Sequence, residues 1–345
     1  MATQQAISRF DTFFTPSGKL TQAVLSAVLS ALLLNACGGG GSSASNATVV
    51  TDPVAPVLTV APGTPTASPP APVTNPGAPQ LTGNTATDGF NWFNYRRQLL
   101  GEPQLVRTAT IDTAAQGHSQ YQQLNNTISH EQIAGKPGFT GVALPDRLQA
   151  ANFRFLRNSY AYGEVISSTS DASGVNAAED LITAIYHRFA IFEPMFRQGG
   201  AGSAVSSSGR TYFTVDLVAD GLDPFLGRGK FLVYPVNGQQ GLPPVFFSDY
   251  ESPDPVAGRN QVGYPISIHA DITSTVAVTS FTVRPRGGSV LPAQLLAHAS
   301  DPQTPASAAA LIPLDVLAGN TTYDVQFAGV VDGTAVTRAW SFTTR

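Results

Sequence analysis

Residues 38–83 constrain the fold more than any other stretch, because they hold almost nothing that could form a hydrophobic core. They consist mainly of Gly, Ser, Thr, Pro, Ala and Val, and Asp52 is their one charged residue. Such a composition cannot bury enough apolar surface to offset the entropy lost on folding. We therefore expect a flexible linker over 37–83, with the folded domains after it.

The single cysteine, Cys37, is a second constraint, because no intramolecular disulfide can form. Stability must come from burial and hydrogen bonds, and the 42% hydrophobic residues of the 345-residue chain permit a sizeable core. The formal net charge is -4, and no cluster of Lys and Arg stands out. Nucleic acid is therefore not an expected partner, because phosphate neutralisation needs clustered cations.

Residues 1–36 have the layout of an export signal. Residues 20–36 carry no charge and are mostly apolar or small, but they are slightly short for a membrane span. The end of this stretch, Leu34-Asn35-Ala36-Cys37, resembles a bacterial lipobox, in which the cysteine thiol takes a thioether-linked diacylglycerol.

The lipobox resemblance predicts a signal peptide over 1–36 and an exported protein whose partner is a membrane of the cell envelope, held through lipid on Cys37. Gly38 follows the cysteine, so no Asp argues for retention at the inner membrane, and we expect the outer membrane. The alternatives are an uncleaved N-terminal anchor and an ordinary secretory signal.

Folding signals resume near Thr87 and predict an α+β domain over 84–220. Apolar residues at helical spacing precede Gly101 and Pro103, which end the first helix. Further helices are expected over 110–125, 146–152 and 176–189, and strands over 201–206 and 211–218.

Residues 221–345 read as a connector followed by a β domain. Asp332-Gly333 is a two-residue hairpin signal, and placing Val331 opposite Thr334 fixes the register of the flanking strands. That register puts a set of large apolar side chains on one face, as a half-buried sheet requires. The set comprises Tyr323, Val325, Phe327, Trp340 and Phe342. Residues 317–323 and 234–238 resemble parts of Ig-like and fibronectin-like bacterial domains, which implies a β-sandwich.

Three polar residues, each in its own short motif, are the candidate functional residues. They are His130, Glu164 and His187, in a chain with only 5 His and 12% charged residues. Neutral imidazoles with a carboxylate can bind zinc or another divalent cation, with His130 and His187 as the expected metal ligands. Glu164 could also act as an acid or base on a bound water, which makes it the candidate catalytic residue. Alternatively, Glu164 and His187 form a buried structural pair.

Residues 88–220 resemble the CAP superfamily, which comprises the cysteine-rich secretory, antigen 5 and pathogenesis-related 1 proteins, in its cysteine-poor bacterial branch. The matching pieces occur in the family's order. They are Asn94-Tyr95-Arg96-Arg97, residues 115–121, Ser129-His130, Arg147, Gly163-Glu164 and His187-Arg188, with Pro194 and a Gly-rich turn after them. The resemblance implies an α-β-α sandwich over 84–220.

The same resemblance implies a cavity with two His and two acids, three of which match His130, Glu164 and His187. The second acid would stand about one turn before His187, where the chain has Thr183 and Ala184. Asp180 is the nearest acid that shares a helix face with His187, and we include it among the expected cavity residues. His118 lies on an apolar helix face and is expected to be structural and outside the site.

These observations favour a binding module displayed at the cell envelope, whose His/Glu cavity binds a divalent cation, a small ligand or an envelope component. The alternative is a metal-assisted hydrolase acting on envelope or extracellular material. A third possibility is a structural surface adhesin that acts through the β domain. The missing second acid favours binding over catalysis.

Overall fold

The computed structural model describes residues 5–7 and 77–345. Cys37 and residues 38–76 of the predicted linker lie outside these residues, as does the predicted signal peptide except for the short strand β1 (Gln5–Ile7). Within the described part of the chain, no helix has both the length and the apolar character needed to cross a membrane.

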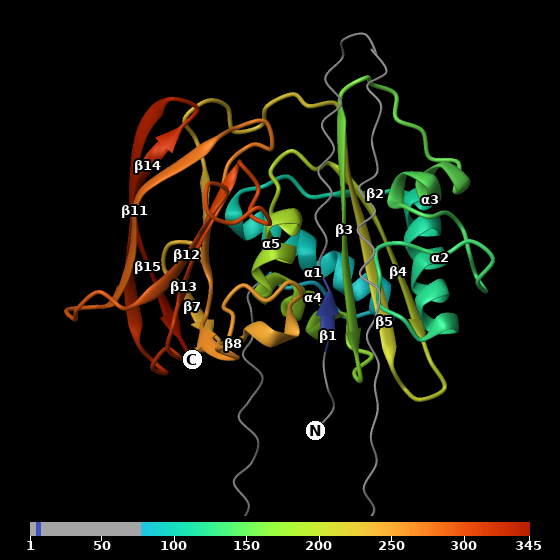
Figure 1. Cartoon of the computed structure of the whole chain (residues 1–345), viewed down its shortest axis with the longest axis horizontal. Helices are drawn as coiled ribbons and strands as arrows, with labels where there is room; N and C mark the ends of the chain where they lie inside the picture. The colour runs from blue at the N-terminus through green and yellow to red at the C-terminus, as the bar shows by residue number, and fades with distance from the viewer. Residues whose placement is uncertain (1–4, 8–76) are drawn as a thin grey trace, which may run out of the picture. The chain divides into compact units, whose positions relative to one another are not determined.

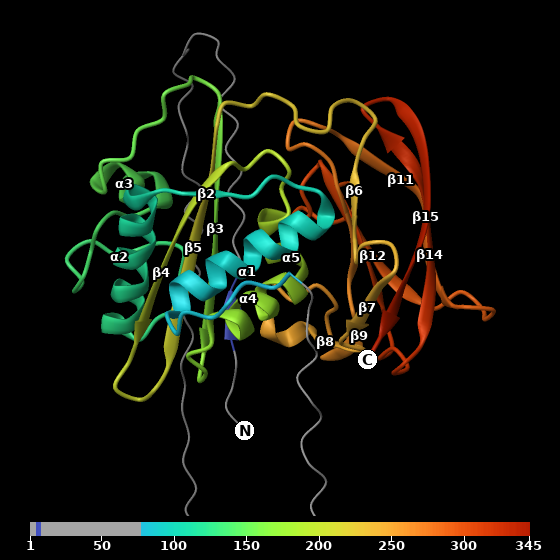
Figure 2. The ribbon, with the colours of Figure 1, turned by 180° about the vertical axis from the view of Figure 1, so that it is seen from behind.

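The first part of the described chain is a five-stranded sheet with helices on both faces. Figures 1 and 2 show α2 and α3 on one face and α1, α4 and α5 on the other. The strand order is β1-β3-β5-β4-β2, which confirms the predicted α-β-α sandwich. The elements are α1 (Thr85–Leu100), β2 (Val106–Arg107), α2 (Ala109–Asn125), α3 (Leu144–Ala150), β3 (Tyr160–Thr169), α4 (Gly174–Thr183), α5 (Ile185–Ile191), β4 (Gln198–Val205) and β5 (Thr211–Asp220).

Both faces of β3 are buried, and its side chains alternate between the two helical layers. Ala161 and Val165 pack in the core with α1, α4 and α5. Tyr162 packs instead with apolar residues of α2 and α3. Because side chains on a strand alternate between faces, Glu164 points to the α2 and α3 layer. Its partner across the antiparallel pair with β5 is Asp216, on the same face.

The predicted helix over 176–189 is two helices, and this corrects the sequence expectation. Ala184, between α4 and α5, has an extended backbone with φ -67° and ψ 118°. α5 has no side-chain cap of its own at this position. The amide groups at its first turn bind the carboxylate of Glu251, which lies in the β part of the chain.

The second part of the described chain contains two four-stranded sheets and a two-stranded pair. The strand orders are β12-β13-β10-β6 and β11-β14-β15-β7, with β8 and β9 paired separately. The elements are β6 (Leu232–Tyr234), β7 (Gln239–Leu242), β8 (Val245–Phe247), the 3-10 helix η1 (Ser248–Tyr250), β9 (Gln261–Gly263), β10 (Ile266–His269), β11 (Val276–Pro285), β12 (Ala293–Ala297), β13 (Ala308–Pro313), β14 (Thr322–Val331) and β15 (Thr334–Thr344). This confirms a β-rich C-terminal part, and its assignment to the Ig-like class stays a prediction.

The hairpin between β14 and β15 has the predicted register. Val331 pairs with Thr334, and Val325 pairs with Trp340. Asp332 has φ 51° and Gly333 has φ 76°, as a two-residue turn of this type requires. The apolar face predicted for this hairpin is buried throughout, and Trp340 is 4% exposed.

One hydrophobic core runs through both parts of the described chain. It contains Phe93 and Phe213 from the α-β-α sandwich (the helical part) together with Val325 and Trp340 from the C-terminal β part. The connector is fixed as well, because the carboxylate of Asp271 accepts hydrogen bonds from backbone amides at 226–227. The two parts therefore share an extensive buried junction, and the predicted boundary at 220–221 stays a prediction.

Candidate functional site

Glu164 is the centre of a buried polar cluster between β3 and the α2 and α3 layer. Its side chain is 4% exposed. Arg147 Nη2 lies 2.5 Å from Glu164 Oε2, and His130 Nδ1 lies 2.8 Å from Oε1. His118 Nε2 is 3.8 Å from the same Oε1 atom. The carboxylate therefore has a guanidinium and two imidazoles around it.

Arg147 connects this strand to the loop that carries His130. Its side chain is fully buried, and it projects from α3. Nη1 donates to the carbonyl oxygens of His130, at 2.8 Å, and Val142, at 3.3 Å, while Nη2 reaches Glu164. One guanidinium thus fixes the loop backbone and neutralises the acid, because its planar donors can serve both at once.

His118 lies inside the cluster, which corrects the expectation that it lies outside the site. It is fully buried on α2, with Nε2 2.7 Å from the carbonyl oxygen of Ser129 and Nδ1 2.9 Å from Gln132 Nε2. Nε2 therefore carries the proton, and Nδ1 accepts from the Gln132 amide. Burial lowers the pKa of His118 to about 4, so the ring is neutral near pH 7. Its hydrogen bonds suit the structural role expected for it.

Asp216 is a second acid in the cluster, and sequence reasoning did not identify it. It is fully buried on β5, directly opposite Glu164, and no N–H or O–H donor of another described residue meets hydrogen-bond geometry at its oxygens. Burial raises its pKa well above the usual range, and the negative charge of Glu164 raises it further. Burial beside the Glu164 carboxylate therefore favours the neutral form of Asp216.

Glu164 is the ionised member of this pair of acids. Burial alone would raise its pKa, but the guanidinium of Arg147, together with His118 and His130, holds the pKa well below its usual range. With Asp216 and His118 neutral, the charges of Glu164 and Arg147 balance within the cluster. His130 is at its edge, because its side chain is 9% exposed against 4% or less for Glu164, Arg147 and His118.

His187 does not join this cluster, which corrects the expected convergence of His130, Glu164 and His187. Its side chain is fully buried, and Nδ1 lies 3.1 Å from Glu251 Oε1. The same carboxylate accepts the backbone amides of Ile185, Tyr186 and His187, at 2.8, 2.7 and 3.2 Å.

The alternation of side chains on β3 explains the separation. Gly163 faces α5, since a Cβ placed on it would lie 3.7 Å from Ala190. The next residue, Glu164, must therefore point to the opposite face of the sheet. His187 and Glu164 occupy separate motifs that the fold places on opposite sides of a strand.

Asp180 also falls outside the cluster. The expectation that it shares a face with His187 assumed one continuous helix, but the chain bends at Ala184 between α4 and α5. Among the described residues, no group of three or more His, Cys, Asp and Glu side chains is arranged to hold a metal ion. The expected ligand pair of His130 and His187 is not brought together.

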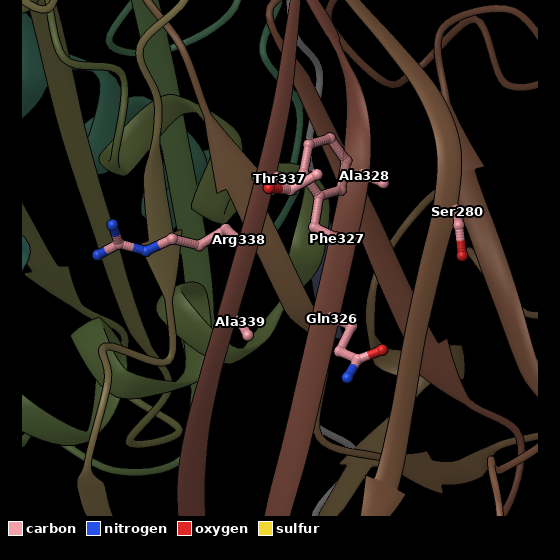
Figure 3. A pocket seen from close by; sticks show the side chains of 7 residues that line it. All are labelled: Ser280, Gln326, Phe327, Ala328, Thr337, Arg338 and Ala339. Carbon is pink, nitrogen blue, oxygen red and sulfur yellow. The ribbon is translucent and has the colours of Figure 1, made fainter.

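A hollow of about 280 Å³ lies elsewhere, on the β part of the described chain. Figure 3 shows the side chains around it, which come from β11, β14 and β15. They are Ser280, Gln326, Phe327, Ala328, Thr337, Arg338 and Ala339. None of the residues of the Glu164 cluster lines it.

One feature of the sequence could have identified Asp216. Asp216 is a lone charged residue within the strand pattern of residues 211–218, and a charge in a strand buried on both faces needs a partner. Its partner could not be named without the register that places it opposite Glu164. Arg147 was identified only as part of a family motif, with no role assigned.

The sequence profile of the cysteine-rich secretory protein family, CAP, matches residues 90–217. No curated protein matches the chain. Among solved structures, an extracellular protein containing an SCP domain from Bacillus anthracis strain Ames is 25% identical, with a TM-score of 0.32. The match covers 39% of this chain and 40% of that one, so it spans two fifths of that protein's length.

An outer surface protein from Borrelia burgdorferi is 15% identical, with a TM-score of 0.31, over 37% of this chain and 87% of that one. The family assignment rests on the profile match, on the ordered motifs that carry His130, Arg147, Glu164 and His187, and on the α-β-α sandwich around them. Residues 90–217 are therefore a CAP domain, and a β-rich part follows this domain.

Proposed function

We propose that the chain is an exported CAP-domain binding module, held at a membrane of the cell envelope by lipid on Cys37, whose small ligand contacts the edge of the Glu164 cluster at His130. The observation that carries this proposal is the 2.8 Å contact between His130 Nδ1 and Glu164 Oε1. A carboxylate that binds one ring nitrogen fixes the orientation of the ring. The cluster thus supports a preorganised contact rather than a loose surface side chain.

The state of Glu164 favours binding over catalysis. A general base works best when its pKa lies near the working pH. The pKa of Glu164 is held well below the usual range of a carboxyl group, and its Oε2 is 2.5 Å from Arg147. Glu164 is therefore a weak base whose role is to position other groups.

Hydrolysis is the second candidate function, and the contact between His130 and Glu164 also supports it. A carboxylate that orients an imidazole is the arrangement of a general base and its orienting group. In that reading His130 is the base that activates a water molecule, and Glu164 is its positioning residue. A metal-assisted version would need a ligand set other than His130 with His187, because His187 binds Glu251.

Replacing Cys37 by serine is expected to leave an unprocessed or soluble species without the lipid, because a hydroxyl cannot form the thioether to lipid. Membrane fractionation and incorporation of radiolabelled palmitate into the parent and the Cys37→Ser variant measure this. Unchanged membrane association and labelling of the variant would disprove the lipid anchor and leave the CAP site untouched.

For the ligand, we expect native mass spectrometry of the Cys37→Ser chain, purified from the cells that produce it, to show a small-molecule adduct. His130→Ala should lose this adduct, because it removes the contact at the edge of the cluster. His298→Ala is the matched control, since His298 Nδ1 meets the carbonyl oxygen of Thr304 in the β part. The proposal would be contradicted if the Cys37→Ser chain carries no adduct, or if this chain and its His130→Ala and His298→Ala variants carry the adduct equally.

Adding zinc chloride in the same experiment separates the candidates. We expect zinc to bind no more tightly than on the order of millimolar, because the ligands His130 and His187 are apart and Arg147 already neutralises Glu164. A micromolar zinc adduct that disappears with His130→Ala would instead support the metal-assisted hydrolase.

A further inference from the structure

The junction between the helical and β parts holds a second cluster of buried charges. It lies where the end of α1, the loop between α5 and β4, and the loop after β10 come together. Arg97, at the end of α1, is fully buried at its centre. Glu102 and Glu193 are buried around it, at 4% and 6% exposure.

The N–H groups of the Arg97 guanidinium donate hydrogen bonds to backbone carbonyl oxygens. Nε donates to Pro103, Nη1 to Ile191 and Glu193, and Nη2 to Phe196, at distances of 2.6 to 3.2 Å. These bonds hold the loop between α5 and β4 against the end of α1. Arg97 is therefore the single fully buried positive charge of the cluster.

The two acids have different partners. Glu102 Oε2 lies 2.8 Å from Arg97 Nη1, but neither of its oxygens has a partner in hydrogen-bond geometry among the described residues. Glu193 Oε1 accepts the backbone amide of Met195, at 3.1 Å, and that of Ile272, at 2.9 Å. The second of these bonds crosses the junction to the loop after β10.

We propose that Glu193 is a proton-operated latch, which holds Ile272 of the β part while it is protonated and loosens when it ionises. The geometry supplies the reason. Arg97 can balance one buried carboxylate, and Glu102 lies closest to it. Ionised Glu193 would add a second buried negative charge at the same place, and unbalanced buried charge is strongly unfavourable.

Two further charged residues, Arg197 and Asp271, belong to the loops that meet at Glu193. Arg197, from the same loop as Glu193, is partly exposed, and its guanidinium lies over the ring of Phe225. Asp271, from the loop after β10, pairs electrostatically with Arg197 and accepts the amides of residues 226–227. Arg197 interacts most strongly with Asp271 and also with Glu102 and Glu193, so Arg97 remains the only fully buried cation among the described residues of the cluster.

The direction of the pH dependence follows from both acids. Burial raises the pKa of Glu102 to about 7, against the opposing effect of Arg97. Burial also raises the pKa of Glu193 well above its usual range, and the charge of Glu102 adds to this, against the opposing effects of the Met195 and Ile272 amides and of Arg97. An acid whose pKa is raised in the folded state stabilises it below the unfolded value of 4.5, and this stabilisation is lost as the pH rises through the folded value. The latch therefore weakens toward alkaline pH.

Hydrogen exchange with mass spectrometry tests the proposal on the full chain. Between about pH 6 and about pH 9, protection of the amides at residues 271–274, corrected for intrinsic exchange, should fall at least roughly tenfold. In Glu193→Gln it should change by less than about twofold, because the amide oxygen still accepts Ile272 and cannot ionise. Amides of β14 serve as the internal reference.

A second variant keeps the test decisive if Glu193→Gln fails to fold. Glu102→Gln removes the neighbouring negative charge, so Arg97 can balance ionised Glu193 and the pH-dependent loss of protection at 271–274 should become smaller than in the parent. The latch is excluded if the parent shows no pH-dependent loss at 271–274, if Glu193→Gln loses protection as the parent does, or if Glu102→Gln leaves the loss as large as in the parent.

Discussion

Replacing Glu251 by alanine is expected to lower the free energy of unfolding by about 3 to 5 kcal/mol, because it removes the acceptor of several buried hydrogen bonds at once. The side chain is fully buried and accepts three backbone amides at the start of α5 together with His187 Nδ1. Its removal leaves these donors without an acceptor inside the protein, and such groups retain their full desolvation cost. Urea unfolding of the full chain, followed by circular dichroism, measures the change.

Two further variants show whether burial causes this loss. Glu251→Gln retains an acceptor oxygen and should lose less than the alanine variant. Asp223→Ala is the matched control, because Asp223 is 81% exposed although its ion pair with Arg157 is shorter, at 2.6 Å. It should cost less than about 1 kcal/mol. A loss below about 1 kcal/mol for Glu251→Ala would show that water replaces the carboxylate and that the junction is open there.

The features that the sequence predicted correctly depend on neighbouring residues. Gly101 ends α1 with φ 85°, and its backbone amide binds the last carbonyl oxygens of the helix. Asp332 and Gly333 fix the β14–β15 register through a turn of two residues. In both cases the residues that determine the structure lie within a few positions of it, so the chemistry of one segment suffices.

The incorrect predictions concern features that depend on residues far away in the sequence. Apolar spacing over 176–189 fits one helix, and the break at Ala184 depends on Glu251, which lies 65 positions after Tyr186. With this break, His187 on α5 and Glu164 on β3 lie in different surroundings. No pattern within either segment contains that information.

The site was predicted in part for the same reason. His130 and Glu164 were identified from their motifs, and they meet at 2.8 Å. Asp216 was missed, because its role exists only through the pairing of β3 with β5. His118 was placed outside, because an apolar helix face suggests a core residue, yet its ring lies 3.8 Å from Glu164. A buried polar cluster is defined by contacts across elements, which spacing along the chain does not give.

Replacing Arg147 by alanine is expected to cost about 3 to 5 kcal/mol near pH 7, because it leaves the ionised carboxylate of Glu164 buried without its counter-charge. It also releases the carbonyl oxygens of His130 and Val142. The pKa of Glu164 is held low by Arg147, so in the parent this stabilisation is present above the unfolded value of 4.5 and is lost as the pH falls. The variant should therefore lose less stability than the parent as the pH falls below about 4.5.

A double-mutant cycle with Glu164→Gln separates this ion pair from the packing of the Arg147 side chain. Glu164→Gln removes the charge that needs a counter-ion, so Arg147→Ala should cost less in that background, with a coupling of at least about 1 kcal/mol. Asp216 gives the cycle a further check. Once Glu164 is neutral, the negative charge that helped raise the pKa of Asp216 is absent, and Asp216→Asn should then have a smaller effect than in the parent. Additive losses for Arg147→Ala and Glu164→Gln would mean that the two residues stabilise the fold separately, and that the cluster is not the single charge-balanced unit on which the proposed site depends.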